Sequence, residues 1–164
     1  MDIFVLLMLI LLNGLFSMSE IAVISCRKFR LQKLSSAGNR RAQAALSLKT
    51  DPVSFLSTVQ VGITMVGILS GAIGETALVD PFSLWLTGFP SVQPYARGIA
   101  IVVVIVTLTF FSVVVGELVP KQLGLMAPEK IAMIIALPMK VLAYVTQPLI
   151  WLLSASSNLV LRIL

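Results

Sequence analysis

The feature that most constrains this chain is an apolar run from Ile99 to Val115 that contains no charged side chain. At about 1.5 Å per residue, a helix built on this run and its neighbours would cross a hydrocarbon core of about 30 Å. The rest of the chain is similar, since 58% of its 164 residues are hydrophobic and 12% are charged. Soluble domains carry about a quarter charged residues, so the composition excludes a large soluble domain.

Three segments have the length and composition of a membrane span, at about residues 3–25, 53–73 and 98–126. The second follows Asp51-Pro52, which is a typical helix start, and the third ends before Ala127-Pro128. Several prolines and glycines between Gly74 and Arg97 indicate a turn-rich connection there. The sequence therefore predicts an all-α membrane protein with three transmembrane helices.

Lys and Arg residues are distributed unevenly between the predicted spans. Seven of the twelve lie between Arg27 and Lys49, with no acidic residue among them. If the chain has three spans, eleven of the twelve Lys and Arg residues lie on one side of the membrane or at that interface, and Arg97 alone lies on the other side. Because short loops rich in Lys and Arg stay in the cytoplasm, we expect the N-terminus outside and the C-terminus inside. A cleaved signal peptide begins with basic residues, whereas Asp2 precedes the first span here, so we expect this span to remain in the mature protein.

Two segments outside the spans are expected on the cytoplasmic side. Residues 28–49 suggest amphipathic helices along the membrane surface, with a solvated loop as the alternative. Residues 129–164 are apolar but contain Pro138, Pro148 and Lys140. Because proline breaks helices and lysine is costly in lipid, we expect short interfacial helices there. The alternative is a fourth span between Val141 and Leu161.

The composition also excludes several functions. There is no histidine, which removes His-based zinc sites, Ser-His-Asp triads and imidazole proton shuttles. We expect no enzyme and, without a nucleic-acid motif, no nucleic-acid partner. The one cysteine, Cys26, is expected to be a small buried hydrophobe.

One ionisable residue, Glu117, lies deep within a predicted span. A carboxylate at membrane depth is unfavourable unless it is paired, neutralised or hydrated. Three residues later, Pro120 has no N–H to donate to the carbonyl of Gly116, which leaves that oxygen free. A carboxylate, a free carbonyl and neighbouring hydroxyls are the ligands that Mg²⁺ and Ca²⁺ require. We therefore expect a cation site here.

Polar and small residues recur at intervals of three and four in the first two spans, so that they share one helical face. They are Asn13, Ser17 and Glu20 in the first span, and Ser57, Gln60, Thr64, Gly67 and Gly71 in the second. The alternative interpretation is an ordinary helix–helix contact, because small and weakly polar residues line many such contacts in membranes.

Three of these polar residues have a similar predicted depth. Counted to the nearest boundary residue, Ser17 is ten residues before Arg27, Thr64 twelve after Pro52, and Glu117 eleven before Pro128. At roughly 1.5 Å per residue, each lies about 15 to 18 Å from the inner boundary, near the middle of the core. This favours one shared site. The alternative for Glu117 is a structural ion pair with Lys121, one helical turn away.

Three motifs occur in order along the chain: Asn13-Gly14-Leu15-Phe16-Ser17-Met18-Ser19-Glu20-Ile21-Ala22, Gln60-Val61-Gly62-Ile63-Thr64 and Gly116-Glu117-Leu118-Val119-Pro120-Lys121. With these motifs the chain resembles, over nearly its whole length, the transmembrane domain of the CorC and cyclin M (CNNM) family of magnesium transporters, also described as hemolysin-like. The resemblance implies three spans with a belt of juxtamembrane helices and a homodimer in the bacterial inner membrane. It also implies export of Mg²⁺, coupled to Na⁺.

The resemblance further implies a ligand set for Mg²⁺, consisting of Ser17, Thr64, Glu117 and the carbonyl of Gly124. Secondary candidates are Asn13, Glu20, Gln60 and Gly116. Thr64 departs from the family pattern, which has an asparagine there, so an amide ligand is replaced by a hydroxyl. Full-length relatives continue into cytoplasmic CBS domains that bind ATP, and residues 1–164 are expected to be the membrane domain without them.

Three functions remain open at this point. The first is export of Mg²⁺ by a secondary transporter. The second is export of organic cations such as polyamines, which is implied by the similarity of Phe16-Ser17-Met18-Ser19-Glu20 to some relatives and would make Glu20 a second carboxylate. The third is a membrane anchor and dimerisation platform for cytoplasmic regulatory domains.

Overall fold

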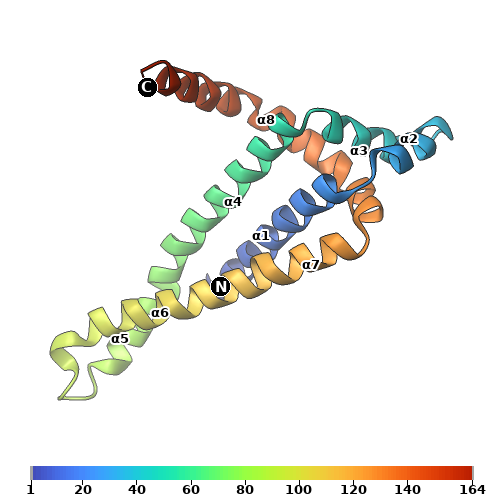
Figure 1. Ribbon diagram of the computed structural model, residues 1–164. Coiled ribbons are helices and arrows are strands. Elements are labelled where there is room, and N and C mark those ends of the chain that lie inside the picture. The colour runs from blue at the N-terminus through green and yellow to red at the C-terminus, as the bar shows by residue number, and fades with distance from the viewer. Residues whose placement is uncertain (1, 164) are drawn as a thin grey trace. The chain divides into compact units, whose positions relative to one another are not determined.

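The computed structural model describes the backbone of residues 2–163 and the side chains of residues 2–153, 155 and 156. This part of the chain consists of helices and turns (Figure 1). Four of its helical segments are long and apolar enough to cross a membrane: Asp2–Ser25, Pro52–Leu86, Gln93–Met126 and Pro128–Leu153. The prediction of an all-α fold built on membrane-spanning helices is confirmed.

The chain forms two compact units. The first comprises Met1–Ser17 and Ile63–Gln122, and the second comprises Met18–Gly62 and Leu123–Leu164. Helices α1 (Asp2–Ser25), α4 (Pro52–Gly74) and α7 (Val119–Met126) contribute residues to both units. Residues that the sequence assigns to a single site can therefore belong to different units.

One buried cluster of the first unit lies between helices α5 (Asp80–Leu86) and α6 (Ala96–Val113), which are joined by a turn and the 3₁₀ helix η2 (Gln93–Tyr95). Its buried residues are Val79, Leu86, Ala96, Ala100 and Val104. The Trp85 ring packs against Phe82 and Phe89, with ring centroids 5.7 and 5.1 Å away. Small residues on α6 let the two helices of this hairpin approach closely.

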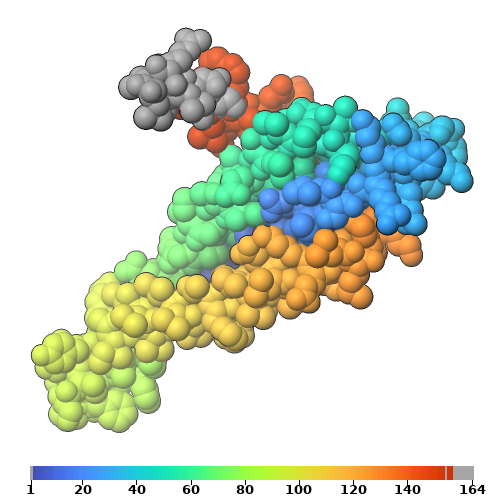
Figure 2. Space-filling view, viewed as in Figure 1, coloured from blue at the N-terminus to red at the C-terminus, as the bar shows by residue number. Residues whose placement is uncertain are grey.

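Helix α6 also exposes large apolar side chains, and its surface is yellow in Figure 2. Val102, Val106 and Phe110 are 62, 63 and 61% exposed. Contiguous apolar surface of this kind is unfavourable in water and is typical of a face that contacts lipid or protein. The exposure therefore agrees with a membrane-embedded helix.

Two π-helical turns interrupt the long helices of the first unit, and each ends two residues before a proline. Turn η1 (Glu75–Val79) precedes Pro81, and turn η3 (Val114–Leu118) precedes Pro120. In each case the residue before the proline donates its N–H to the carbonyl five residues earlier. A proline ring clashes with the carbonyl four residues earlier in an α-helix, and the wider turn relieves this clash. The helix therefore continues through Asp80-Pro81, where the sequence had indicated a turn, and ends after Leu86.

In the second unit, helix α3 (Arg40–Thr50) packs against both α2 (Lys28–Ser36) and α8 (Pro128–Ile163). Gly38, with φ of +86°, reverses the chain between α2 and α3. The side-chain oxygen of Asn39 then caps α3 by accepting the N–H groups of Arg41 and Ala42 at 3.0 and 3.1 Å. The buried residues of this unit include Leu31, Ala42, Ala45, Leu48, Ala132 and Ala136. The prediction of amphipathic helices over residues 28–49 is confirmed, whereas their place on a membrane surface stays a prediction.

Helix α8 differs from the predicted row of short interfacial helices. It is one helix of 36 residues, Pro128–Ile163, that contains both Pro138 and Pro148. The expectation that these prolines end the helix was wrong. Proline removes one hydrogen bond, but in an apolar surrounding a helix remains the way to pair most backbone groups. Residues 128–153 are long enough to cross a membrane, and Leu164 of the predicted segment lies outside the described residues.

Cys26, directly after α1, is 3% exposed, and its Sγ donates to the carbonyl of Val23 at 3.1 Å. Burial raises the pKa of its thiol. The thiol is therefore neutral near pH 7, which confirms the expected role of a small buried hydrophobe.

Candidate functional site

Glu117 lies within the π-helical turn η3, and Pro120 withholds the N–H that would pair with the carbonyl of Gly116. The sequence predicted that this oxygen is free. In the structure it accepts a hydrogen bond from Nδ2 of Asn13 at 3.0 Å. A carbonyl oxygen has two acceptor positions, so this bond leaves capacity for a second partner. π-helical turns inside α-helices are frequent at functional sites.

Helix α1 approaches η3 very closely. A Cβ added to Gly116 would lie 3.2 Å from both Asn13 Nδ2 and the carbonyl oxygen of Ile10. A Cβ added to Gly14 would lie 2.9 Å from Cγ of Pro120. The two glycines therefore permit a backbone approach that brings the polar face of α1 onto the turn that carries Glu117.

We expect Asn13→Leu to reduce the thermal stability of the protein, because it leaves the carbonyl of Gly116 without its partner. An unsatisfied buried carbonyl costs about 1–3 kcal/mol. The measurement is a thermal unfolding scan in Mg²⁺-free detergent solution. Gln60→Leu, which replaces an exposed amide of α4 in the same way, is the matched control and is expected to have little effect. Equal losses in both variants would contradict a specific role of the Asn13 bond.

The carboxylate of Glu117 forms an ion pair with Lys121, with Oε1 and Nζ 2.7 Å apart. The two side chains are 45% and 35% exposed, respectively. This is the structural pair considered above as the alternative role of Glu117. Exposed i,i+4 pairs contribute only a few tenths of a kcal/mol in soluble helices. The ammonium group therefore neutralises the carboxylate without being strongly bound to it.

Ser17 is 1% exposed, and its Oγ has no hydrogen-bond partner in the described part of the chain. It follows Asn13 by four residues on α1, so the two share one face of the helix. Burying a hydroxyl without a partner costs about 1–3 kcal/mol. Such a group in a native protein requires an explanation, and an ion or water that completes its bonding is one of the usual ones.

The other predicted ligands are placed differently. Thr64 belongs to the first unit with Ser17 and Glu117, and its side chain is exposed. Gly124 belongs to the second unit, where a Cβ added to it would lie 2.3 Å from Cγ2 of Ile21. Glu20 is half-buried and Gln60 is exposed, both also in the second unit. The structure thus joins Asn13 to Gly116 directly, and it leaves a ligand set of Ser17, Thr64, Glu117 and Gly124 a prediction.

Clusters of three or more His, Cys, Asp or Glu side chains that could hold a metal do not occur in the described part of the chain. A cation site on these residues would combine single carboxylates with hydroxyl, amide and carbonyl oxygens.

Sequence reasoning missed a cavity of about 530 Å³ in the first unit. Its polar lining residues are Asn13, Ser70, Glu75, Thr109 and Ser112, and most of the remaining lining is aliphatic. Gly67 and Gly71 line it as well, and a Cβ at either position would meet no atom within 4 Å. In the sequence, Gly67 and Gly71 belong to the row of small and polar residues that recur at intervals of three and four. Glu75 follows Gly71 by four residues and extends the same row. The signal was present, but the sequence assigned Glu75 to the connection outside the membrane.

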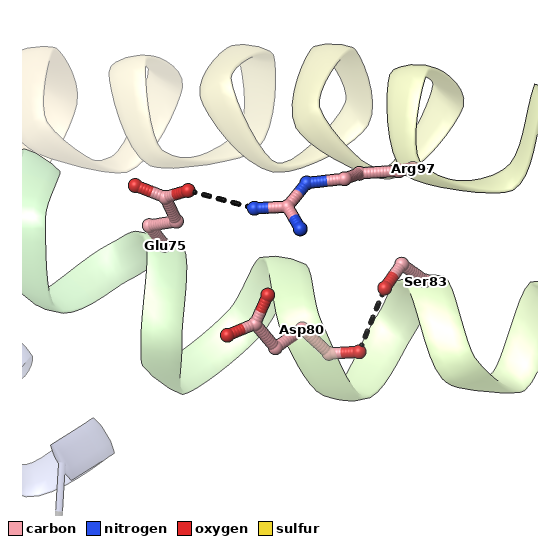
Figure 3. Close-up of polar contacts among 4 residues, drawn as sticks. All are labelled: Glu75, Asp80, Ser83 and Arg97. Carbon is pink, nitrogen blue, oxygen red and sulfur yellow. Dashed lines mark hydrogen bonds and ion pairs between the residues drawn. The ribbon is translucent and has the colours of Figure 1, made fainter.

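Glu75 is paired across the first unit with Arg97 (Figure 3). The distance between Oε1 of Glu75 and Nη2 of Arg97 is 3.1 Å, and the side chains are 57% and 67% exposed. On the neighbouring turn, the hydroxyl of Ser83 donates to the carbonyl of Asp80 at 2.9 Å (Figure 3). Both carboxylates of the π-helical turns, Glu75 and Glu117, are therefore neutralised by a basic side chain of the same unit.

Comparison with known proteins places these features in a family. The family described as the cyclin M transmembrane N-terminal domain (CNNM) matches residues 4–164. The chain is 45% identical over 163 residues to the UPF0053 protein sll0260 of Synechocystis sp.. The matched region covers 99% of this chain and 36% of that protein. It is 33% identical over 162 residues to the polyamine export protein of Escherichia coli, again covering 99% and 36%. It is 36% identical over 154 residues to the UPF0053 protein YhdT of Bacillus subtilis, covering 92% and 33%. The chain spans about a third of the length of these curated relatives.

Proposed function

Because the chain belongs to the cyclin M transmembrane N-terminal domain family, we propose that it is the membrane domain of a secondary transporter that exports Mg²⁺, coupled to Na⁺. In this proposal the four ligands of the transported Mg²⁺ are the side chains of Ser17, Thr64 and Glu117 and the carbonyl of Gly124. Asn13, Glu20, Gln60 and the carbonyl of Gly116 are secondary candidates.

The observation that carries this proposal is the buried hydroxyl of Ser17, which has no hydrogen-bond partner among the residues that the structure describes. It lies one helical turn from Asn13, the residue that holds α1 against the π-helical turn of Glu117. A hydroxyl oxygen, a carboxylate and carbonyl oxygens are hard donors of the kind that Mg²⁺ prefers. Bound cation would satisfy the hydroxyl and compete with Lys121 for the carboxylate.

We propose the topology and assembly that the sequence predicted: three spans with the N-terminus outside, a homodimer, and the bacterial inner membrane as the location. The uneven distribution of Lys and Arg supports this orientation. Helix α8 packs against α3, which supports a position of part of α8 beside the juxtamembrane helices.

Ser17→Ala tests the proposed site, because the effect depends on whether Mg²⁺ is present. Without Mg²⁺ the variant is expected to unfold at the same or a higher temperature than the wild type, since the Ser17 hydroxyl that it removes bonds to no described residue. At saturating Mg²⁺ the wild type gains stability by mass action, and a tenfold weaker affinity removes about 1.4 kcal/mol of that gain. The measurement is the midpoint of thermal unfolding over a Mg²⁺ titration. A loss of stability that is equal with and without Mg²⁺ would contradict the assignment.

A second candidate function is export of organic cations, and two observations favour it. The relative in Escherichia coli that is named polyamine export protein is 33% identical over 99% of this chain. The cavity of about 530 Å³ is also far larger than a bare ion needs. The third function, a membrane anchor for regulatory domains, has no observation of its own in its favour.

A further inference from the structure

We propose that the cavity of the first unit is a binding site for a linear organic amine. In this proposal Glu75 receives a terminal ammonium group, and Arg97 is a tethered cation that competes for the same carboxylate. The proposal rests on the proposed function in one respect, namely that the chain handles cations. None of the four proposed ligands of Mg²⁺ lines this cavity, and of the secondary candidates Asn13 lines it.

The size and lining of the cavity argue for an organic cation. A volume of about 530 Å³ is within the range of roughly 300–1,000 Å³ that small-molecule sites occupy. The lining is largely aliphatic, with Ile63, Val66, Ile101, Val104, Ile105 and Leu108 among its residues. A carbon chain with charged ends matches aliphatic walls and a carboxylate at once.

The polar groups of the cavity are few, and a single one of the lining residues is charged. Glu75 supplies that charge, while Asn13, Ser70, Thr109 and Ser112 supply an amide and three hydroxyls. An ammonium group donates three hydrogen bonds and needs acceptors of this kind. Once Arg97 is displaced from Glu75, charge complementarity therefore favours a cation over a neutral or anionic ligand.

Glu75 lies in the π-helical turn that directly follows α4, and it lines the cavity together with Val79 of the same turn. It is 23 residues after Pro52, the first residue of α4. This corresponds to about 35 Å along a helix, which exceeds a hydrocarbon core of ~30 Å. In the proposed orientation Glu75 is therefore at the outer boundary, where an exported cation would leave the protein.

Arg97 can release a bound ammonium group from Glu75 by competing for the same carboxylate. Its guanidinium is 3.1 Å from the carboxylate, and both side chains are more than half exposed. Exposed ion pairs of this kind contribute little to stability and are easily exchanged. An arriving ammonium group can therefore displace Arg97, and Arg97 can displace the ammonium group again. Its covalent tether keeps the competitor at a high local concentration at all times.

The test uses spermidine, a linear triamine, and isothermal titration calorimetry of the whole chain in lipid nanodiscs at low salt. The wild type is expected to bind spermidine. Glu75→Gln is expected to weaken binding at least tenfold, whereas Arg97→Gln is expected to strengthen it about threefold to tenfold. The two variants break the same ion pair and are matched in their effect on folding. Because Arg97→Gln acts in the opposite direction, damage to the fold cannot imitate the expected result.

A third variant tests the cavity itself. Gly71→Leu adds a side chain to the lining at a position where a Cβ meets no other atom within 4 Å, and it is expected to weaken spermidine binding by occupying the space. Wild-type affinity in Glu75→Gln, or weaker binding in Arg97→Gln, would overturn the proposal. So would a wild type that does not bind spermidine.

Mg²⁺ titrations of the same samples, together with Glu117→Gln, keep the two proposals apart. If spermidine binding is lost in Glu117→Gln and retained in Glu75→Gln, the amine binds at Glu117 and the inference about the cavity is wrong. If spermidine binds as expected while no sample binds Mg²⁺, the inference holds and the proposed Mg²⁺ export fails.

Discussion

Glu117→Gln is expected to weaken Mg²⁺ binding at least about 100-fold, which corresponds to roughly 2.7 kcal/mol. Among the proposed ligands Glu117 alone carries a charge, so the substitution removes the main electrostatic attraction for a divalent ion. The shape of the side chain is conserved, and the substitution leaves Asn13 bonded to the carbonyl of Gly116. Calorimetry with Mg²⁺ measures the affinity, and efflux of Mg²⁺ from proteoliposomes measures transport.

Lys121→Gln is the matched control, because it breaks the same ion pair at 2.7 Å and keeps the carboxylate. If Glu117 binds Mg²⁺, this variant is expected to bind Mg²⁺ as well as or better than the wild type, since a competing cation is gone. If Glu117 serves the ion pair alone, both variants lose the same stability and Mg²⁺ binding is unaffected by either. Wild-type binding with no efflux from vesicles would instead support the anchor function.

Gly124→Ala is expected to reduce the thermal stability of the protein, because a Cβ added there comes closer to another atom than at any other glycine whose surroundings are described. The added Cβ would lie 2.3 Å from Cγ2 of Ile21 and 2.9 Å from the carbonyl oxygen of Met18. The backbone oxygen cannot move aside without shifting α1, and overpacking of this kind costs about 1–3 kcal/mol. The measurement is the midpoint of thermal unfolding in Mg²⁺-free detergent solution.

Gly67→Ala is the control for this substitution, since it is also inside a helix and its Cβ would meet no atom within 4 Å. Alanine favours a helix over glycine by up to about 1 kcal/mol, so this variant is expected to be as stable as the wild type or more stable. A similar loss in both variants would show that the close packing around Gly124 is not the cause.

Much of the fold could be predicted from local features of the sequence. Asp51-Pro52 correctly marks the start of α4, where the Asp51 carboxylate accepts the N–H of Ser54 at 3.3 Å. Ala127-Pro128 correctly marks the boundary between α7 and α8. These boundaries depend on one or two residues and their own backbone. The sequence did not predict that helices continue through Pro81, Pro138 and Pro148. Proline is known to destabilise a helix interior, but its effect in a given protein also depends on the surroundings, which the sequence does not reveal.

The candidate site was predictable only in its parts. Helical spacing placed Asn13 and Ser17 on one face, and Pro120 pointed to an unpaired carbonyl at Gly116. That Asn13 occupies this carbonyl depends on a contact between residues 103 positions apart, which spacing within one helix cannot reveal. The cavity beside Glu75 escaped prediction for the same reason, since three separate helices contribute its lining.

The π-helical turn η3 also changes the phase of the helix that contains it. A hydrogen bond from Val119 to Val114 spans five residues instead of four, so the turn accommodates one residue more than an α-helical turn. Successive residues of an α-helix are rotated by about 100°, and the side chains beyond η3 are therefore turned by about that angle relative to an uninterrupted α6. Loss of a single residue from Val114–Leu118 would rotate Lys121 and all that follows out of register with α1. Chain length at this turn is thus a strict requirement for the packing of η3 against α1.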